Sequence, residues 1–179
     1  MSNIKNYGGY DVNRLEFLGK GTQGRVYKIN NEKCIKIFQS KKVCNQETKT
    51  LIMAQKSSIF PKLYSYGDYY IIREYINGIE LDKYLKNYPL TVEISRKIIE
   101  LYETIVDIGY SRQDTTLFHI FYTSSGEFKI IDTGRVMKEN SSYPRLILMG
   151  LKKLGYEEEF LIHVKLLKPR LYEFLLNKK

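Results

Sequence analysis

Short apolar runs separated by turn residues fill the first part of the chain. Runs rich in β-branched and aromatic residues occur at positions 15–18, 26–29 and 34–38, with glycines between the first two. Such runs are typical of consecutive antiparallel strands. Two further runs, 63–66 and 69–75, flank Gly67-Asp68 and predict a hairpin. Between the runs 34–38 and 63–66, apolar and polar positions recur at helical spacing and predict a short helix over 42–56.

The pattern changes after Asn77-Gly78. Thr91 is a suitable N-cap for a long helix that we expect to end at Gly109. The helix has an apolar stripe of five residues: Ile94, Ile98, Leu101, Ile105 and Ile108. A second hairpin is expected from 117–123 and 127–131, and the tail from 143 is helical in pattern, with breaks near Gly155 and Pro169. The sequence therefore predicts an α+β chain with a strand-rich N-lobe over about 1–75, a hinge at 74–78 and a helical C-lobe over 79–179.

Composition restricts the function classes. The chain has 179 residues and a net charge of +9, which favours an anionic ligand such as a nucleotide, a nucleic acid or an acidic protein. No apolar run approaches the roughly 20 residues of a membrane span, and the N-terminus lacks the apolar stretch of a signal peptide. We therefore expect a cytoplasmic protein that does not enter a membrane. Two cysteines and two histidines argue against a disulfide framework and a zinc site.

A glycine-rich loop is the first motif with chemical meaning. Residues 19–26 match G-x-G-x-x-G-x-V, with Gly19, Gly21, Gly24 and Val26 at the defined positions. The motif lies between two predicted strands, whereas a dinucleotide-binding loop lies between a strand and a helix. Glycines let a backbone approach phosphate oxygens closely.

A lysine on the next predicted strand needs a partner. Alternation places Lys36 on the same face as Cys34 and Phe38, and a lysine among apolar neighbours requires a carboxylate. Glu47, one helical turn before Leu51, is the candidate. We predict that Lys36 and Glu47 form an ion pair inside the N-lobe.

These motifs resemble the protein kinase family. In that family a strand lysine contacts the ATP phosphates and pairs with a helix glutamate. The resemblance implies that Glu74 and Ile76 bind adenine through their backbone, that Phe121 lies under it, and that Arg112-Gln113-Asp114 is the catalytic loop, with Asp114 as the base. His119 stands where the family has a metal-binding asparagine. Asp132, in Asp132-Thr133-Gly134, would hold Mg²⁺ or Mn²⁺.

The resemblance spans residues 15–135. Only 45 residues follow Gly134, and no A-P-E motif is visible. The plan is similar to minimal bacterial and archaeal kinases of the Bud-type and RIO-type groups and to small spore-former kinases. It implies a bilobal protein-kinase-like fold with a truncated C-lobe, ATP as cofactor and a protein Ser/Thr substrate.

Other interpretations stay open. Taken singly, Asp114 and Asp132 are also compatible with turn carboxylates. His119 favours a nucleotide-binding pseudokinase, since imidazole is a poor ligand for Mg²⁺. A small-molecule kinase would need a larger helical lobe, and a nucleic-acid-binding module rests on the net charge and scattered tyrosines. Arg73, where the family usually has an apolar residue, is expected to point inward and pair with Glu47 or Asp132. A shift of one residue in its strand would instead turn it to solvent.

Overall fold

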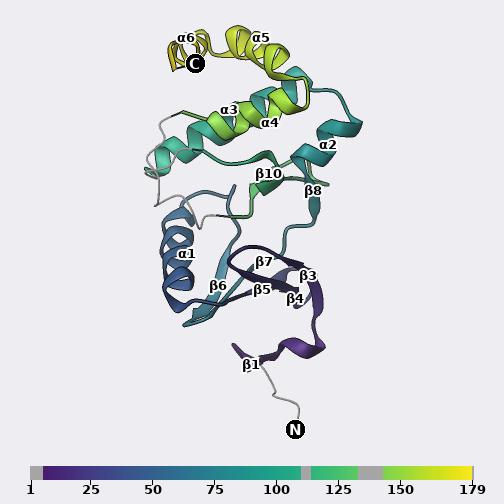
Figure 1. Cartoon of the computed structure of the whole chain (residues 1–179), viewed down its shortest axis with the longest axis vertical. Coiled ribbons are helices and arrows are strands. Elements are labelled where there is room, and N and C mark those ends of the chain that lie inside the picture. The colour runs from purple at the N-terminus through teal and green to yellow at the C-terminus, as the bar shows by residue number, and fades with distance from the viewer. Residues whose placement is uncertain (1–5, 110–113, 133–142, 179) are drawn as a thin grey trace. The chain divides into compact units, whose positions relative to one another are not determined.

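A computed structural model of the chain describes residues 6–109, 114–132 and 143–178. The fold is of the mixed α+β type, with antiparallel sheets (Figure 1). It divides into two compact units, Met1–Asn77 and Gly78–Lys179, which we call the N-terminal and the C-terminal unit. The boundary falls within the predicted hinge segment 74–78.

A five-stranded antiparallel sheet forms the body of the N-terminal unit, in the order β3-β4-β5-β7-β6. Its strands are β3 (Glu16–Lys20), β4 (Gly24–Lys28), β5 (Lys33–Phe38), β6 (Leu63–Gly67) and β7 (Tyr70–Glu74). All five strands were predicted to within a few residues. The predicted β6–β7 hairpin is present, and its turn lies at Asp68-Tyr69, one residue after the predicted Gly67-Asp68, because Gly67 still pairs with Tyr70.

Helix α1 (Lys41–Ala54) contacts β5, β6 and β7. Glu47 and Leu51 are buried on it, as the helical spacing predicted. A small ribbon precedes the sheet and was not predicted. It consists of β1 (Asn6–Tyr7), β2 (Tyr10–Asp11) and the 3₁₀ turn η1 (Val12–Arg14).

Helix α3 (Val92–Ile108) is the longest element of the C-terminal unit, and its ends confirm the sequence prediction. The Thr91 side chain accepts a hydrogen bond from Ile94 N at 3.2 Å, which caps the N-terminus. Gly109 ends the helix with φ of 80°, a left-handed conformation that glycine adopts without strain. Four residues of the predicted stripe are buried, and Ile108 is half-buried.

A three-stranded antiparallel sheet, in the order β10-β9-β8, also lies in this unit. Its strands are β8 (Gly78–Glu80), β9 (Ile120–Thr123) and β10 (Phe128–Ile130). Strand β8 and the following helix α2 (Leu81–Asn87) were not predicted. The predicted strand over 117–123 is wrong in its first three residues, because Leu117–His119 form a 3₁₀ turn, η2.

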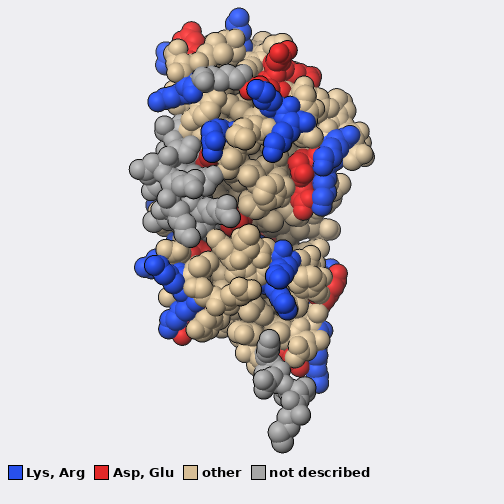
Figure 2. Space-filling model, viewed as in Figure 1, with Lys and Arg blue, Asp and Glu red and all other residues tan. Residues whose placement is uncertain are grey.

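Three helices follow the three-stranded sheet along the chain: α4 (Arg145–Lys153), α5 (Glu157–Leu167) and α6 (Pro169–Lys178). The predicted breaks near Gly155 and Pro169 separate them. In the part of the chain that the structure describes, no helix combines the length and apolarity needed to cross a membrane. Lys and Arg side chains are scattered over the face seen in Figure 2, without one continuous basic patch.

Candidate functional site

A buried ion pair links the sheet and the helix of the N-terminal unit. Lys36 Nζ donates hydrogen bonds to both carboxylate oxygens of Glu47, at 2.7 and 2.6 Å. The two side chains are 10% and 3% exposed. The predicted pairing is therefore confirmed. Both ions have lost their water shell, so the short hydrogen bonds between them must offset that desolvation cost.

The register of the sheet places Lys36 on the face that α1 covers. Lys36 lies opposite Val26 of β4 and Ile71 of β7. The ring of Phe38, two residues along the same face, has its centroid 4.9 Å from Lys36 Nζ. An ammonium over a ring face is stabilised by the ring quadrupole, so Phe38 adds a second support to the lysine.

Arg73 is buried, with only 7% of its surface exposed. It lies opposite Cys34 in the β5–β7 register, which puts both on the face that carries Lys36. The alternative in which a shifted strand turns Arg73 to solvent is thus wrong. Burial raises the pKa of the Cys34 thiol, and the adjacent Arg73 guanidinium partly opposes that rise.

The three glycines of the motif, Gly19 in β3, Gly21 in the following turn and Gly24 at the start of β4, differ in their surroundings. A Cβ added at Gly24 would overlap the carbonyl oxygen of Ile37, so the sheet itself requires glycine there. A Cβ at Gly19 or Gly21 would meet nothing within 4 Å. Packing therefore explains one glycine of the motif and leaves open space beside the other two.

Residues predicted to bind adenine occur in both units. Glu74 ends β7, and its carbonyl oxygen accepts a weak hydrogen bond from Cys34 Sγ at 3.6 Å. Ile76 follows it and is buried. Phe121 lies in β9 of the C-terminal unit, opposite Glu80 and Lys129, and is half-buried.

Asp114 is buried in the C-terminal unit, with 4% of its surface exposed. Its Oδ2 accepts a hydrogen bond from Leu146 N at 2.8 Å, in the first turn of α4. The first N–H groups of a helix have no partner within the helix, so a distant carboxylate can cap it. The Asp114 carboxylate also adds to the rise in the pKa of Tyr102 on α3, which burial mainly causes. Sequence reasoning missed the α4 contact, whose only signal was Pro144 before an apolar helix.

His119 and Asp132 lie close together in the C-terminal unit. His119 Nε2 and Asp132 Oδ2 are 3.6 Å apart, and both side chains are about a quarter exposed, at 26% and 23%. The hydrogen bond from Ile131 N to His119 O, at 3.0 Å, fixes the two segments side by side. Among the described residues, no group of three or more His, Cys, Asp or Glu could hold a metal.

Four residues of the predicted motifs lie outside the described residues: Arg112, Gln113, Thr133 and Gly134. The structure thus brings together Lys36 with Glu47, Cys34 with Arg73, and His119 with Asp132. No protein-family model matches the chain, and no curated protein matches it either.

Proposed function

We propose that this protein is an ATP-dependent phosphotransferase with a protein-kinase-like fold, which transfers the γ-phosphate to a Ser or Thr hydroxyl of a protein. The observation that carries the proposal is the buried Lys36–Glu47 pair. Removing two charges from water costs free energy that their attraction offsets only in part. An apolar pair would serve stability as well, so the retained charges favour a role in binding an anion.

The residues around Lys36 fit a nucleotide. Cys34 and Val26 offer small apolar side chains on its sheet face, suited to the flat adenine ring. The open space at Gly19 and Gly21 leaves room for phosphate oxygens beside the backbone. We assign the β-strand lysine to the phosphates, and the backbone of Glu74 and Ile76 to the adenine edge.

The His119–Asp132 pair fits a divalent ion in part. Its carboxylate suits Mg²⁺ or Mn²⁺, while its imidazole suits Mn²⁺ better. Such an ion neutralises charge on the ATP phosphates when it is bound. Asp132 is assigned as the main ligand.

In the proposed reaction the substrate hydroxyl oxygen forms a bond to the γ-phosphorus. The bond between that phosphorus and the oxygen bridging to the β-phosphate breaks, and ADP leaves with its electron pair. Asp114 accepts the hydroxyl proton, which is the role that the resemblance implies.

A second candidate is a pseudokinase that binds nucleotide without transferring phosphate. The burial of Asp114 and its hydrogen bond to Leu146 N favour it, because a carboxylate that caps a helix is less accessible to a substrate hydroxyl. His119 in place of asparagine favours it as well.

Incubation of the full chain with ATP labelled on the γ-phosphate, with Mg²⁺ or Mn²⁺ and with a Ser/Thr-rich protein acceptor, tests the proposal. We expect phosphoprotein and ADP from the wild type and none from Lys36→Ala. Lys33→Ala, on the same strand and beside Tyr64, is the matched control and should stay active. ATP binding without transfer would favour the pseudokinase. No ATP binding by the wild type, at concentrations where kinases are saturated, would refute both.

A further inference from the structure

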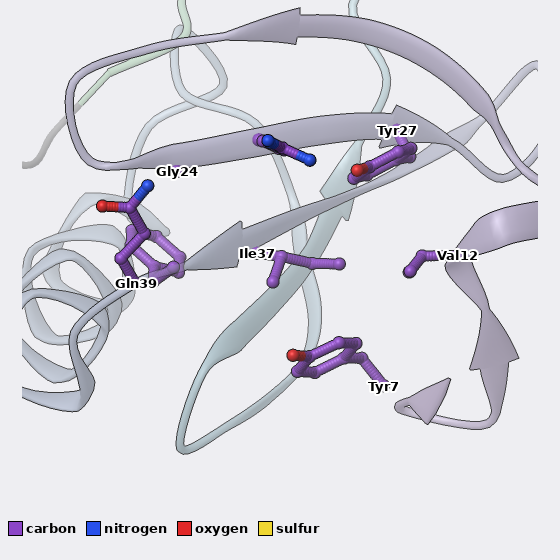
Figure 3. A pocket seen from close by; sticks show the side chains of 8 residues that line it. Tyr7, Val12, Gly24, Tyr27, Ile37 and Gln39 are labelled. Atoms are coloured by element: carbon purple, nitrogen blue, oxygen red, sulfur yellow. The ribbon is translucent and has the colours of Figure 1, made fainter. Parts of the chain in front are cut away.

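A pocket of about 260 Å³ lies within the N-terminal unit (Figure 3). The ribbon that precedes the sheet forms one side of it through Tyr7 and Val12. Strands β4 and β5 form the other. Eight residues line it: Tyr7, Val12, Gly24, Arg25, Tyr27, Ile37, Phe38 and Gln39.

Two tyrosine rings are held in fixed positions at this pocket. Tyr27 makes an edge contact with Phe17, with ring centroids 5.5 Å apart. Tyr7 makes an edge contact with Tyr70, at 6.4 Å. In Figure 3 the rings of Tyr7 and Tyr27 lie on either side of Ile37. Each ring is thus positioned by a second ring before any ligand arrives, which lowers the entropy cost of binding.

The pocket carries one charge. Arg25 is the single charged residue that lines it. Within residues 6–109, 114–132 and 143–178, no ion pair joins Arg25 to a carboxylate. Gln39 and the two tyrosine hydroxyls add neutral hydrogen-bonding groups. The guanidinium is therefore available to an anion, and the side chains of Tyr7, Tyr27 and Ile37 line the same pocket.

We propose that this pocket binds a small aromatic anion, with its ring against Tyr7, Tyr27 and Ile37 and its carboxylate or phosphate on Arg25. The volume suits one ring with one anionic group, because pockets for larger ligands run from about 300 to 1,000 Å³. Arginine binds planar or tetrahedral oxyanions through two N–H groups, so the cation and the rings select for one molecule carrying both features.

Binding of phenyl phosphate to the full chain, followed by NMR titration, tests the site. Inorganic phosphate lacks the aromatic ring and benzyl alcohol lacks the anionic group, so both serve as reference probes. We expect a dissociation constant for phenyl phosphate on the order of 1 mM or tighter, with each reference probe at least about tenfold weaker. The shifted resonances should include those of Tyr7, Tyr27 and Ile37.

Two variants and a competition with ATP locate the binding. Arg25→Met should weaken the binding of phenyl phosphate about tenfold, since a charge-assisted contact is lost. Lys33→Met removes a cation of the same sheet that lies over Tyr64 and outside the pocket, and should change affinity less than twofold. Saturating ATP should leave phenyl phosphate bound, which separates this site from the proposed nucleotide site. The proposal is overturned if Arg25→Met binds normally, if saturating ATP displaces phenyl phosphate, or if the wild type shows no saturable binding.

Discussion

Asp114 and Asp132 have different surroundings, and their amide variants should separate two steps of the proposed reaction. Asparagine at 114 keeps an oxygen to accept the Leu146 N–H, so the contact with α4 survives. Asp114→Asn should therefore retain ATP binding and lose transfer, because it cannot accept the proton. Asp132→Asn should lose the part of ATP binding that depends on the metal. Isothermal titration with and without Mg²⁺, beside a transfer assay, measures both effects. Normal phosphorylation by both variants would contradict the assignment.

The imidazole of His119, next to Asp132, gives a prediction about metal preference. If His119 is a ligand, Mn²⁺ should support turnover better than Mg²⁺, since nitrogen ligands suit Mn²⁺ better. His119→Asn should then restore the use of Mg²⁺. Initial rates across a range of each metal provide the measurement. A wild type that works best with Mg²⁺ and is insensitive to His119→Asn would exclude the ligand role.

Arg73 carries a charge that it cannot lose, in a strand interior beside Cys34. The predicted pairing with Glu47 or Asp132 stays a prediction. We expect Arg73→Met to lower the free energy of unfolding by about 3–5 kcal/mol, because removing one member of a buried ion pair leaves the other charge uncompensated. Chemical denaturation checks the value, with Arg14→Met, at an exposed position, as the control. A melting temperature within about a degree of wild type would rule out the pairing.

At the scale of elements, Gly21 in the turn after β3 and Gly24 at the start of β4 are expected to have different roles. Gly24→Ala should destabilise the fold by about 1–3 kcal/mol, because its methyl group would overlap Ile37 O. Gly21→Ala meets open space and should leave the melting temperature close to that of the wild type. On the proposed function it should still weaken ATP binding, since the methyl group would occupy room needed by phosphate. Thermal melts and ATP titrations of the two variants compare these effects. Equal stability of both variants would contradict the geometry.

The elements that were predicted from sequence share strong local signals. Strand β5 is a run rich in β-branched and aromatic residues, α3 has Thr91 before it and Gly109 after it, and Gly155 and Pro169 separate the last three helices. The missed elements lack such signals. Strand β8 and the ribbon strands β1 and β2 are two or three residues long, too short for a period to appear.

The candidate site was predictable to the extent that alternation and spacing fix a face. Lys36 had to share a face with Cys34, and Glu47 had to lie one turn before Leu51, so their pairing followed. The contact between Asp114 and the first turn of α4 joins positions 32 residues apart and has no periodic signal. The pocket at Arg25 was not predicted either, because the β1–β2 ribbon that forms one side of it was not predicted.

At the scale of the whole molecule, the net charge is unevenly divided. The N-terminal unit has 13 Lys and Arg against six Asp and Glu, whereas the C-terminal unit has 16 against 14. Seven of the nine excess positive charges therefore lie in the unit that holds Lys36 and Arg25. A field of that sign raises the local concentration of anions, which supports both a nucleotide and a small aromatic anion as its ligands.

The two buried cysteines make the N-terminal unit its own reporter of unfolding. Cys34 and Cys44 are the only thiols of the chain, and both lie inside this unit. Burial raises the pKa of Cys44 to about 11, so little thiolate forms while the unit stays closed. Alkylation by iodoacetamide therefore requires the sheet and α1 to separate. The rate of alkylation reports the frequency of that opening alone. Opening of the helices after residue 78 leaves no mark in such an experiment. The alkylation rate of the wild-type chain thus measures how often the N-terminal unit opens.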